Sequence, residues 1–279
     1  MQELIHAIIL GIVQGATEFI PVSSSGHLVI VPWLLGWEDD AYAGLLFDTV
    51  LHWGTLVAIF WVFWPDFLDL IKAALRSIGT RSLADPNARI AWFIVLGSIP
   101  AAVTGLLLKD QIELLFDSPR AAGFFLLVTA ALLAGSELLV RKVQQLRLMR
   151  EMKLWDAIFI GLAQAIALAP GISRSGSTIA AGLVRKFRRD EAARFSFFLG
   201  TPAFLGAGLL QMADTLSTDA GQVTGNVLPL LAGFIASAVA GVIAIRFLLA
   251  YLRRRSLYVF ALYCTVVGLA VIALTFIRP

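Results

Sequence analysis

The sequence predicts an all-α polytopic membrane protein whose two halves form an inverted repeat. Three observations lead to this fold class. The 279 residues are 59% hydrophobic and only 15% charged, whereas charged residues make up about a quarter of an ordinary soluble domain. Six apolar segments are long enough to cross a bilayer as helices, which takes about 20 residues. One polar motif occurs twice, at an offset of 150 residues.

The composition also excludes several classes of protein. A mean hydropathy of +0.84 is far above that of soluble proteins. The net charge of +3 could suggest a nucleic-acid partner, but the basic residues fall in short gaps between apolar runs, as in membrane proteins. We therefore expect membrane lipids as partners and no nucleic acid. Cys264 is the single cysteine, so the chain cannot form an internal disulfide or a cysteine zinc site.

The chain reads as one membrane domain, 1–279, with a first repeat in 1–140 and a second in 154–279. Two stretches, 4–35 and 154–184, each have two apolar arms around a polar loop with a proline, Pro21 or Pro170. Non-helical backbone at membrane depth is tolerated only inside protein or beside a water-filled cavity, so we interpret both as re-entrant helical hairpins. The predicted membrane spans are residues 45–64, 90–108, 121–140, 195–212, 227–250 and 257–277.

Each half is then one hairpin followed by three crossings. Because three is odd, the second half enters the membrane in the opposite orientation. The loops support this topology, since one alternate set carries 17 Lys and Arg residues and the other carries three. Cytoplasmic loops are the Lys/Arg-rich ones. The first hairpin is therefore expected to enter from the outer side and the second from the cytoplasmic side, so that their polar loops meet.

The repeated motif is the sequence signal for two related halves. Weaker matches of small residues follow it, such as 97–105 against 233–241. The matched pairs at the offset of 150 are Gly11 and Gly161, Gln14 and Gln164, Ser23 and Ser173, Ser25 and Ser175, and Gly26 and Gly176.

The first motif offers a carboxylate. Gln14 and Glu18 are four residues apart, so on a helix they share one face. With neighbouring hydroxyls, Glu18 could hold a hard divalent cation, Mg²⁺ or Ca²⁺, or act as a general base. The alternative is that Glu18 only forms a buried ion pair with Arg174. Pairing and chemistry do not exclude each other.

The second motif predicts an anion site. Ser173-Arg174-Ser175-Gly176 follows a proline and a glycine, and a loop that opens a helix presents free backbone N–H groups at the positive end of the helix dipole. Arg174 adds a forked cation suited to phosphate. The hydroxyls of Ser173, Ser175 and Thr178 could bind the anion or only cap the helix.

The first loop also places His27 beside Ser23, Ser24 and Ser25. An imidazole next to hydroxyls suits a nucleophile and its base, or a histidine that itself attacks phosphorus. Asp48 and His52 share a helix face as well, and they could support the site from outside it or only hydrogen-bond each other.

The pattern from Gln14 through Pro21 to His27, together with the stretch from Pro170 to Thr178, resembles the two signature motifs of the bacterial undecaprenyl-diphosphate phosphatases, the bacitracin-resistance family. The resemblance covers essentially the whole chain. It implies hydrolysis of undecaprenyl diphosphate to undecaprenyl phosphate, which recycles the lipid carrier for cell-wall synthesis, in the bacterial inner membrane with a site open to the outer face. The implied catalytic residues are Glu18, His27, Arg174 and the loop serines, Ser24 among them.

At the position of Gln14 the family has either Glu or Gln. Because this chain has Gln, the motif contains one carboxylate, Glu18, and no carboxylate pair that could bind the metal. The nucleophile stays open between Ser24, with His27 or Glu18 as its base, and His27. The oligomeric state also stays open, with a homodimer among the options.

Two other functions compete. Paired re-entrant hairpins in an inverted repeat are also the plan of secondary transporters, so a transporter or lipid flippase with a midplane anion site is the main alternative. The type 2 phosphatidic acid phosphatases are suggested by Ser25-Gly26-His27 and by Ser173-Arg174. The second motif of that family also needs a downstream histidine and aspartate, and no histidine follows His52.

Overall fold

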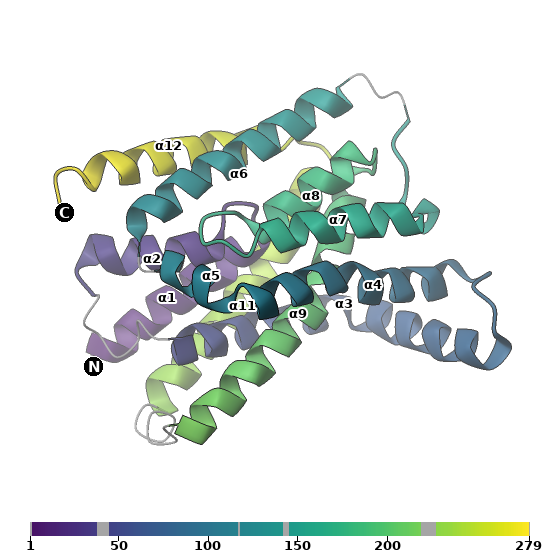
Figure 1. Cartoon of the computed structure of the whole chain (residues 1–279), viewed down its shortest axis with the longest axis horizontal. Helices are drawn as coiled ribbons and strands as arrows, with labels where there is room; N and C mark the ends of the chain where they lie inside the picture. The colour runs from purple at the N-terminus through teal and green to yellow at the C-terminus, as the bar shows by residue number, and fades with distance from the viewer. Residues whose placement is uncertain (1, 38–44, 117, 142–144, 219–226, 279) are drawn as a thin grey trace.

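The computed structural model describes residues 2–37, 45–116, 118–141, 145–218 and 227–278, and within these ranges it forms helices and no strand. Figure 1 shows how they pack. The helices are α1 (Gln2–Phe19), α2 (Ser24–Leu35), α3 (Leu45–Thr80), α4 (Pro86–Leu107), α5 (Lys109–Phe116), α6 (Pro119–Val140), the 3₁₀ turn η1 (Met149–Glu151), α7 (Leu154–Ile166), α8 (Arg174–Val184), α9 (Arg189–Thr218), α11 (Val227–Leu252) and α12 (Tyr258–Leu274).

Each of the six predicted spans coincides with one helix. Five of these helices, α3, α4, α6, α9 and α11, are long and apolar enough to cross a membrane. The sixth, α12, is apolar but has 17 residues. An apolar α-helix satisfies its own backbone groups in lipid, which is why such sequences form this structure. The chain is therefore an all-α, multi-pass membrane protein, as predicted.

Several boundaries differ from the prediction, among them those of α9, which extends beyond the expected span 195–212 at both ends. Helix α3 continues to Thr80, well beyond the expected end near residue 64, because Pro65 does not break it and only kinks it at Phe63 (φ −113°, ψ 21°). The segment 109–120, expected as a loop, contains the short helix α5. Most of the predicted outer loop 37–44 lies outside the described residues.

The two predicted hairpins correspond to α1 with α2 and to α7 with α8. Helices α2, α7 and α8 have 12, 13 and 11 residues, too few to cross a bilayer at 1.5 Å per residue. Their depth and opposite directions in a membrane remain predictions.

An aromatic layer supports the polar centre. Phe19, directly after Glu18, is fully buried and packs edge to face on Phe197 of α9, with ring centroids 5.3 Å apart. Phe197 follows Ser196, whose carbonyl contacts Arg174. This packing fixes the end of α1 relative to α9.

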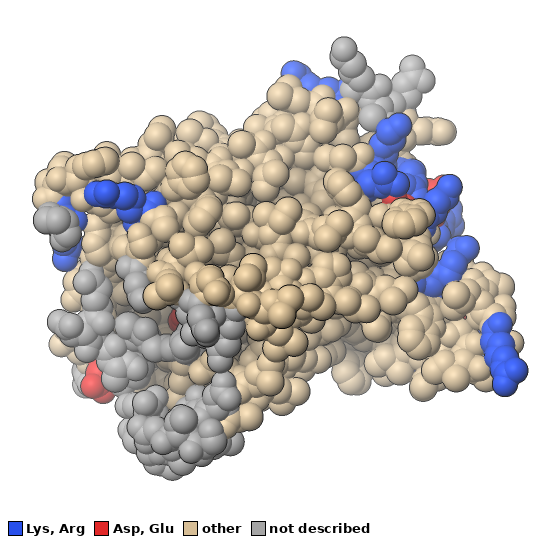
Figure 2. All heavy atoms as spheres, viewed as in Figure 1, with Lys and Arg blue, Asp and Glu red and all other residues tan. Residues whose placement is uncertain are grey.

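Charged residues gather at one end of the molecule. Figure 2 shows Lys and Arg side chains at the end where α3 connects to α4 and where α7 begins. Several of these basic side chains form ion pairs with buried acids. Asp156 accepts from Arg147 at 2.8 Å and from Arg185 at 2.6 Å, and Glu137 pairs with Arg189. These ion pairs hold the ends of α6, α7, α8 and α9 together.

Glycines let the hairpins approach helices of the other half. A Cβ on Gly11 would overlap the carbonyl oxygen of Gly233 in α11, and a Cβ on Gly161 would overlap that of Gly97 in α4. The sequence matches Gly11 with Gly161 and Gly97 with Gly233. Matched glycines thus meet in crossed pairs, α1 on α11 and α7 on α4, which is the exchange expected of a two-fold repeat.

We predict that Gly161→Ala lowers stability by about 1–3 kcal/mol, because the added methyl must separate α7 from α4. The melting temperature of the purified protein in detergent measures this. Gly135→Ala is the control, since no atom lies within 4 Å of a Cβ at that position. Equal melting temperatures for the two variants would contradict the close helix contact.

Candidate active site

The polar turns of the two hairpins meet in the protein interior. Serine side chains cap both second helices: Ser23 Oγ accepts from the Gly26 amide at 3.2 Å, and Ser173 Oγ accepts from the Gly176 amide at 3.0 Å. The cap by Ser173 was among the roles predicted for the serines of the second motif, and Ser23 takes the same role in the first. The Gly171 amide of the second turn donates to Ser23 Oγ of the first at 3.1 Å. One serine thereby joins the two turns.

The first turn is strained. Ser23 has φ 72°, a left-handed conformation that residues with a Cβ rarely adopt and that costs on the order of 1–3 kcal/mol. The amides of Gly26 and Gly171 hold its hydroxyl, and the His27 ring is 2.7 Å from its carbonyl oxygen. The surrounding contacts thus maintain the turn that begins α2 at Ser24.

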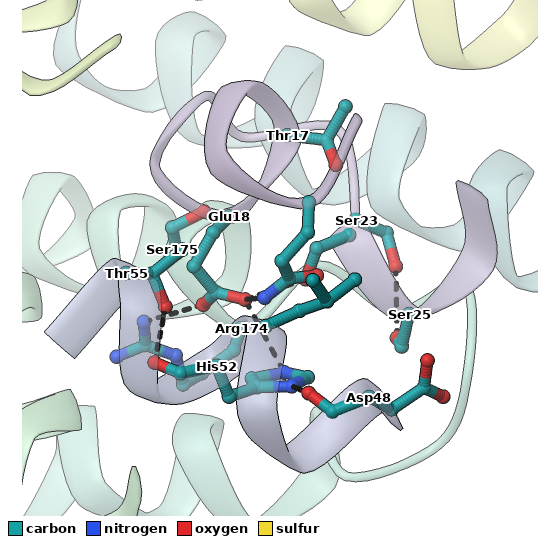
Figure 3. A network of polar contacts seen from close by, with 12 residues as sticks. Thr17, Glu18, Ser23, Ser25, Asp48, His52, Thr55, Arg174 and Ser175 are labelled. Carbon is teal, nitrogen blue, oxygen red and sulfur yellow. Dashed lines mark hydrogen bonds and ion pairs between the residues drawn. The ribbon is translucent and has the colours of Figure 1, made fainter. Parts of the chain in front are cut away.

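Glu18 lies at the centre of the site (Figure 3). Its side chain is buried, and its Oε1 accepts from Arg174 Nη2 at 2.8 Å. Its Oε2 accepts from Ser24 Oγ at 2.6 Å and from Gln14 Nε2 at 3.0 Å. His52 Nε2 is 3.6 Å from the same oxygen. The predicted shared face of Gln14 and Glu18 is confirmed, and so is the ion pair with Arg174.

Arg174 is held on three sides. Besides Glu18, its Nη1 donates to the Ser196 carbonyl at 3.3 Å, and its Cζ lies 4.2 Å from the centroid of the Phe204 ring. Stacking on an aromatic face suits a guanidinium. Among the described residues, its buried Nε has no hydrogen-bond partner.

His52 comes closer to the centre than predicted. Its Nδ1 is 2.7 Å from the Asp48 carbonyl oxygen, one turn earlier in α3, and this contact turns Nε2 toward Glu18. The spacing of Asp48 and His52 signalled that they share a face. The approach of His52 to Glu18 depends on how α1 packs against α3, which the local pattern does not contain.

His27 faces the other way. Its Nδ1 contacts the Ser23 carbonyl, and its Nε2 lies 2.7 Å from the Tyr263 hydroxyl of α12, with the two rings stacked. The His27 imidazole therefore lies at the contact of α2 with α12, and the structure does not bring it to Glu18.

Two other predicted ligands are used inside the protein. Thr178 Oγ1 bonds the Arg174 carbonyl at 2.8 Å and the Ser196 hydroxyl at 2.6 Å. Ser175 Oγ bonds Ser173 Oγ and the Ile20 carbonyl. Both hydroxyls stabilise the junction of α8 with its neighbours.

A cavity of about 350 Å³ opens beside these groups. Its polar lining residues are Glu18, Ser23, Ser24, Ser25, Asp48, His52, Ser173 and Arg174. Its apolar lining residues include Ala101, Gly105, Ile112, Ala167, Leu168 and Phe204, the last of which stacks on Arg174. A lining with both polar and apolar residues suits a ligand with an anionic head and a hydrocarbon tail.

The donor set also suits a hard cation. In the described part of the chain, no three His, Cys, Asp or Glu side chains form a metal cage. Glu18 and Asp48 nevertheless border the same cavity, and Mg²⁺ is usually held by one or two carboxylates together with substrate phosphates. If a cation binds with the substrate, these two acids are the described residues that would hold it.

Comparisons with known proteins agree with the motifs. A family model described as bacitracin resistance protein BacA matches residues 7–270. Proteins named undecaprenyl-diphosphatase are similar over nearly their full length: that of Methanosphaera stadtmanae is 46% identical over 99% of both chains, and that of Pelotomaculum thermopropionicum is 44% identical over 98% of this chain and 97% of its own. That of Desulforudis audaxviator is 43% identical over 98% of both chains. The chain belongs to the bacitracin resistance protein BacA family.

Proposed function

We propose that this protein is an integral membrane undecaprenyl-diphosphatase, which hydrolyses undecaprenyl diphosphate to undecaprenyl phosphate and inorganic phosphate and so recycles the lipid carrier for cell-wall synthesis. One observation carries the chemistry. The Ser24 hydroxyl donates to Glu18 at 2.6 Å, and the other oxygen of Glu18 is bound to Arg174. A hydroxyl on a carboxylate base, beside a phosphate-binding cation, suits phosphoryl transfer.

In the first step, Ser24 Oγ attacks the terminal phosphorus and its proton passes to Glu18. The bond from that phosphorus to the bridging oxygen breaks, and prenyl phosphate leaves with the electron pair. Arg174 and the backbone amides that begin α8 offset the negative charge. Water then attacks the seryl phosphate, Glu18 returns its proton to Ser24 Oγ, and the water protons leave on inorganic phosphate.

Geometry supports Ser24 over His27 as the nucleophile. Both ring nitrogens of His27 are engaged, by the Ser23 carbonyl and the Tyr263 hydroxyl. His27 is better suited to position the strained turn, because it holds the residue directly before Ser24. The transporter or flippase alternative is not favoured, since the similar proteins reported above are named as diphosphatases.

The charge distribution supports an orientation. The Lys/Arg-rich end in Figure 2 would lie in the cytoplasm of a bacterial plasma membrane. Gly105 near the end of α4 and Ile112 of α5 border the cavity; Gly105 shortly precedes, and Ile112 lies within, the segment 109–120 of the opposite, Lys/Arg-poor set. The cavity would then open toward the outer face.

Ser24→Ala should lower kcat for phosphate release by about 1,000-fold or more, because the nucleophile is lost. Thr17→Ala is the control, since the Thr17 hydroxyl beside Glu18 only bonds the Val13 carbonyl of its own helix. Rapid acid quenching of wild-type protein with radiolabelled substrate should trap an acid-stable phosphoserine. Acid-labile label on His27 would contradict this assignment.

A divalent cation held by Glu18 and Asp48 would offset charge on the diphosphate. Chelation with EDTA should therefore reduce phosphate release by about ten-fold or more, and added Mg²⁺ or Ca²⁺ should restore it. Initial rates on a prenyl diphosphate in detergent measure the effect. An undiminished rate in EDTA would overturn the cation requirement.

A further inference from the structure

Gln164 of α7 is a buried amide without a partner. It is 1% exposed, and neither its nitrogen nor its oxygen has a hydrogen-bond partner among the described residues. Buried polar groups are rarely left in this state, because they forgo the hydrogen bonds that water would supply. Gln164 also borders the cavity. A ligand in the cavity could therefore complete its hydrogen bonding.

The first hairpin shows which kind of partner Gln164 lacks. Gln14 occupies the matching position there and donates to Glu18 at 3.0 Å. At the offset of 150, the position of Glu18 is taken by Leu168 in the second hairpin, and Leu168 lines the cavity. The second hairpin thus keeps the amide but has no carboxylate for it.

The second hairpin has another donor without a partner, the Nε of Arg174, which is buried. Arg174 occupies the position that matches Ser24 of the first hairpin at the offset of 150, and Ser24 donates to Glu18. The first hairpin therefore places two donors around a carboxylate, and the second places two donors on the cavity wall. An anionic oxygen of a ligand would take the part that Glu18 plays in the first hairpin.

The apolar residues around Gln164 indicate which phosphate oxygen this is. Ala167 and Leu168 follow Gln164 in the same hairpin and line the cavity, and Leu168 lies beside Gly105 of α4. Ser24 lies in the other hairpin, where the terminal phosphate must be attacked. The phosphate nearer these apolar residues is the one that carries the hydrocarbon tail.

We propose that Gln164 binds the prenyl-linked phosphate of the diphosphate, with its amide donating to a phosphate oxygen where the first hairpin has Glu18. The proposal rests on the proposed function. It makes Gln164 a residue that distinguishes a lipid diphosphate from other phosphate compounds.

Gln164→Met keeps the side-chain length and removes the amide. With farnesyl diphosphate as substrate, KM should rise about ten-fold or more, because a hydrogen bond to a charged group is lost. The inhibition constant of farnesyl monophosphate, which keeps the prenyl-linked phosphate, should rise equally, while that of inorganic phosphate should change less than about three-fold. Unchanged constants for farnesyl monophosphate would overturn the role of Gln164.

Two controls separate this role from a structural one. Gln145→Met, in the exposed segment before η1, should leave all constants unchanged. Without substrate, the Gln164→Met variant should melt at the wild-type temperature or above it, since an unpaired buried amide is removed. A lower melting temperature together with an unchanged inhibition constant for farnesyl monophosphate would mean a packing role.

The proposed function has its own test. If wild-type protein releases no phosphate from farnesyl or undecaprenyl diphosphate, the proposed function itself is wrong.

Discussion

The site depends on the pairing of two opposite charges that the chain buries away from water. Glu18 and Arg174 are 156 residues apart in sequence and meet at 2.8 Å. Either charge alone would be very costly to bury without a partner, so the fold must bring the two hairpin turns together. The bond from Gly171 to Ser23 and the crossed glycine contacts of α1 with α11 and α7 with α4 serve this requirement.

The same pairing prepares the chemistry. Because Arg174 occupies one carboxylate oxygen, the other is left to receive Ser24. The strained Ser23 turn and the layer of Phe19 on Phe197 fix the two ends of this arrangement. Groups held in place before substrate binds lower the cost of organising them during the reaction.

Local features were predictable from the sequence. The spacing of Gln14 and Glu18, the serine caps of α2 and α8 and the six apolar segments follow from helical periodicity, capping and hydropathy. The side to which His27 turns and the approach of His52 to Glu18 were not predictable, because they depend on packing against α12 and α1. The continuation of α3 past Pro65 likewise reflects a kink that composition does not encode. The repeat indicated that the hairpins differ, and the structure adds that Gln164 lacks the partner that Gln14 has.

A double-mutant cycle on Glu18→Gln and Arg174→Gln, read as kcat/KM for prenyl diphosphate hydrolysis, tests the central pairing most directly. If the two residues act as one unit, each single variant loses most of the activity, and the double variant is no slower than the slower single variant. Losses that multiply in the double variant would show that the two residues act independently and would contradict this account.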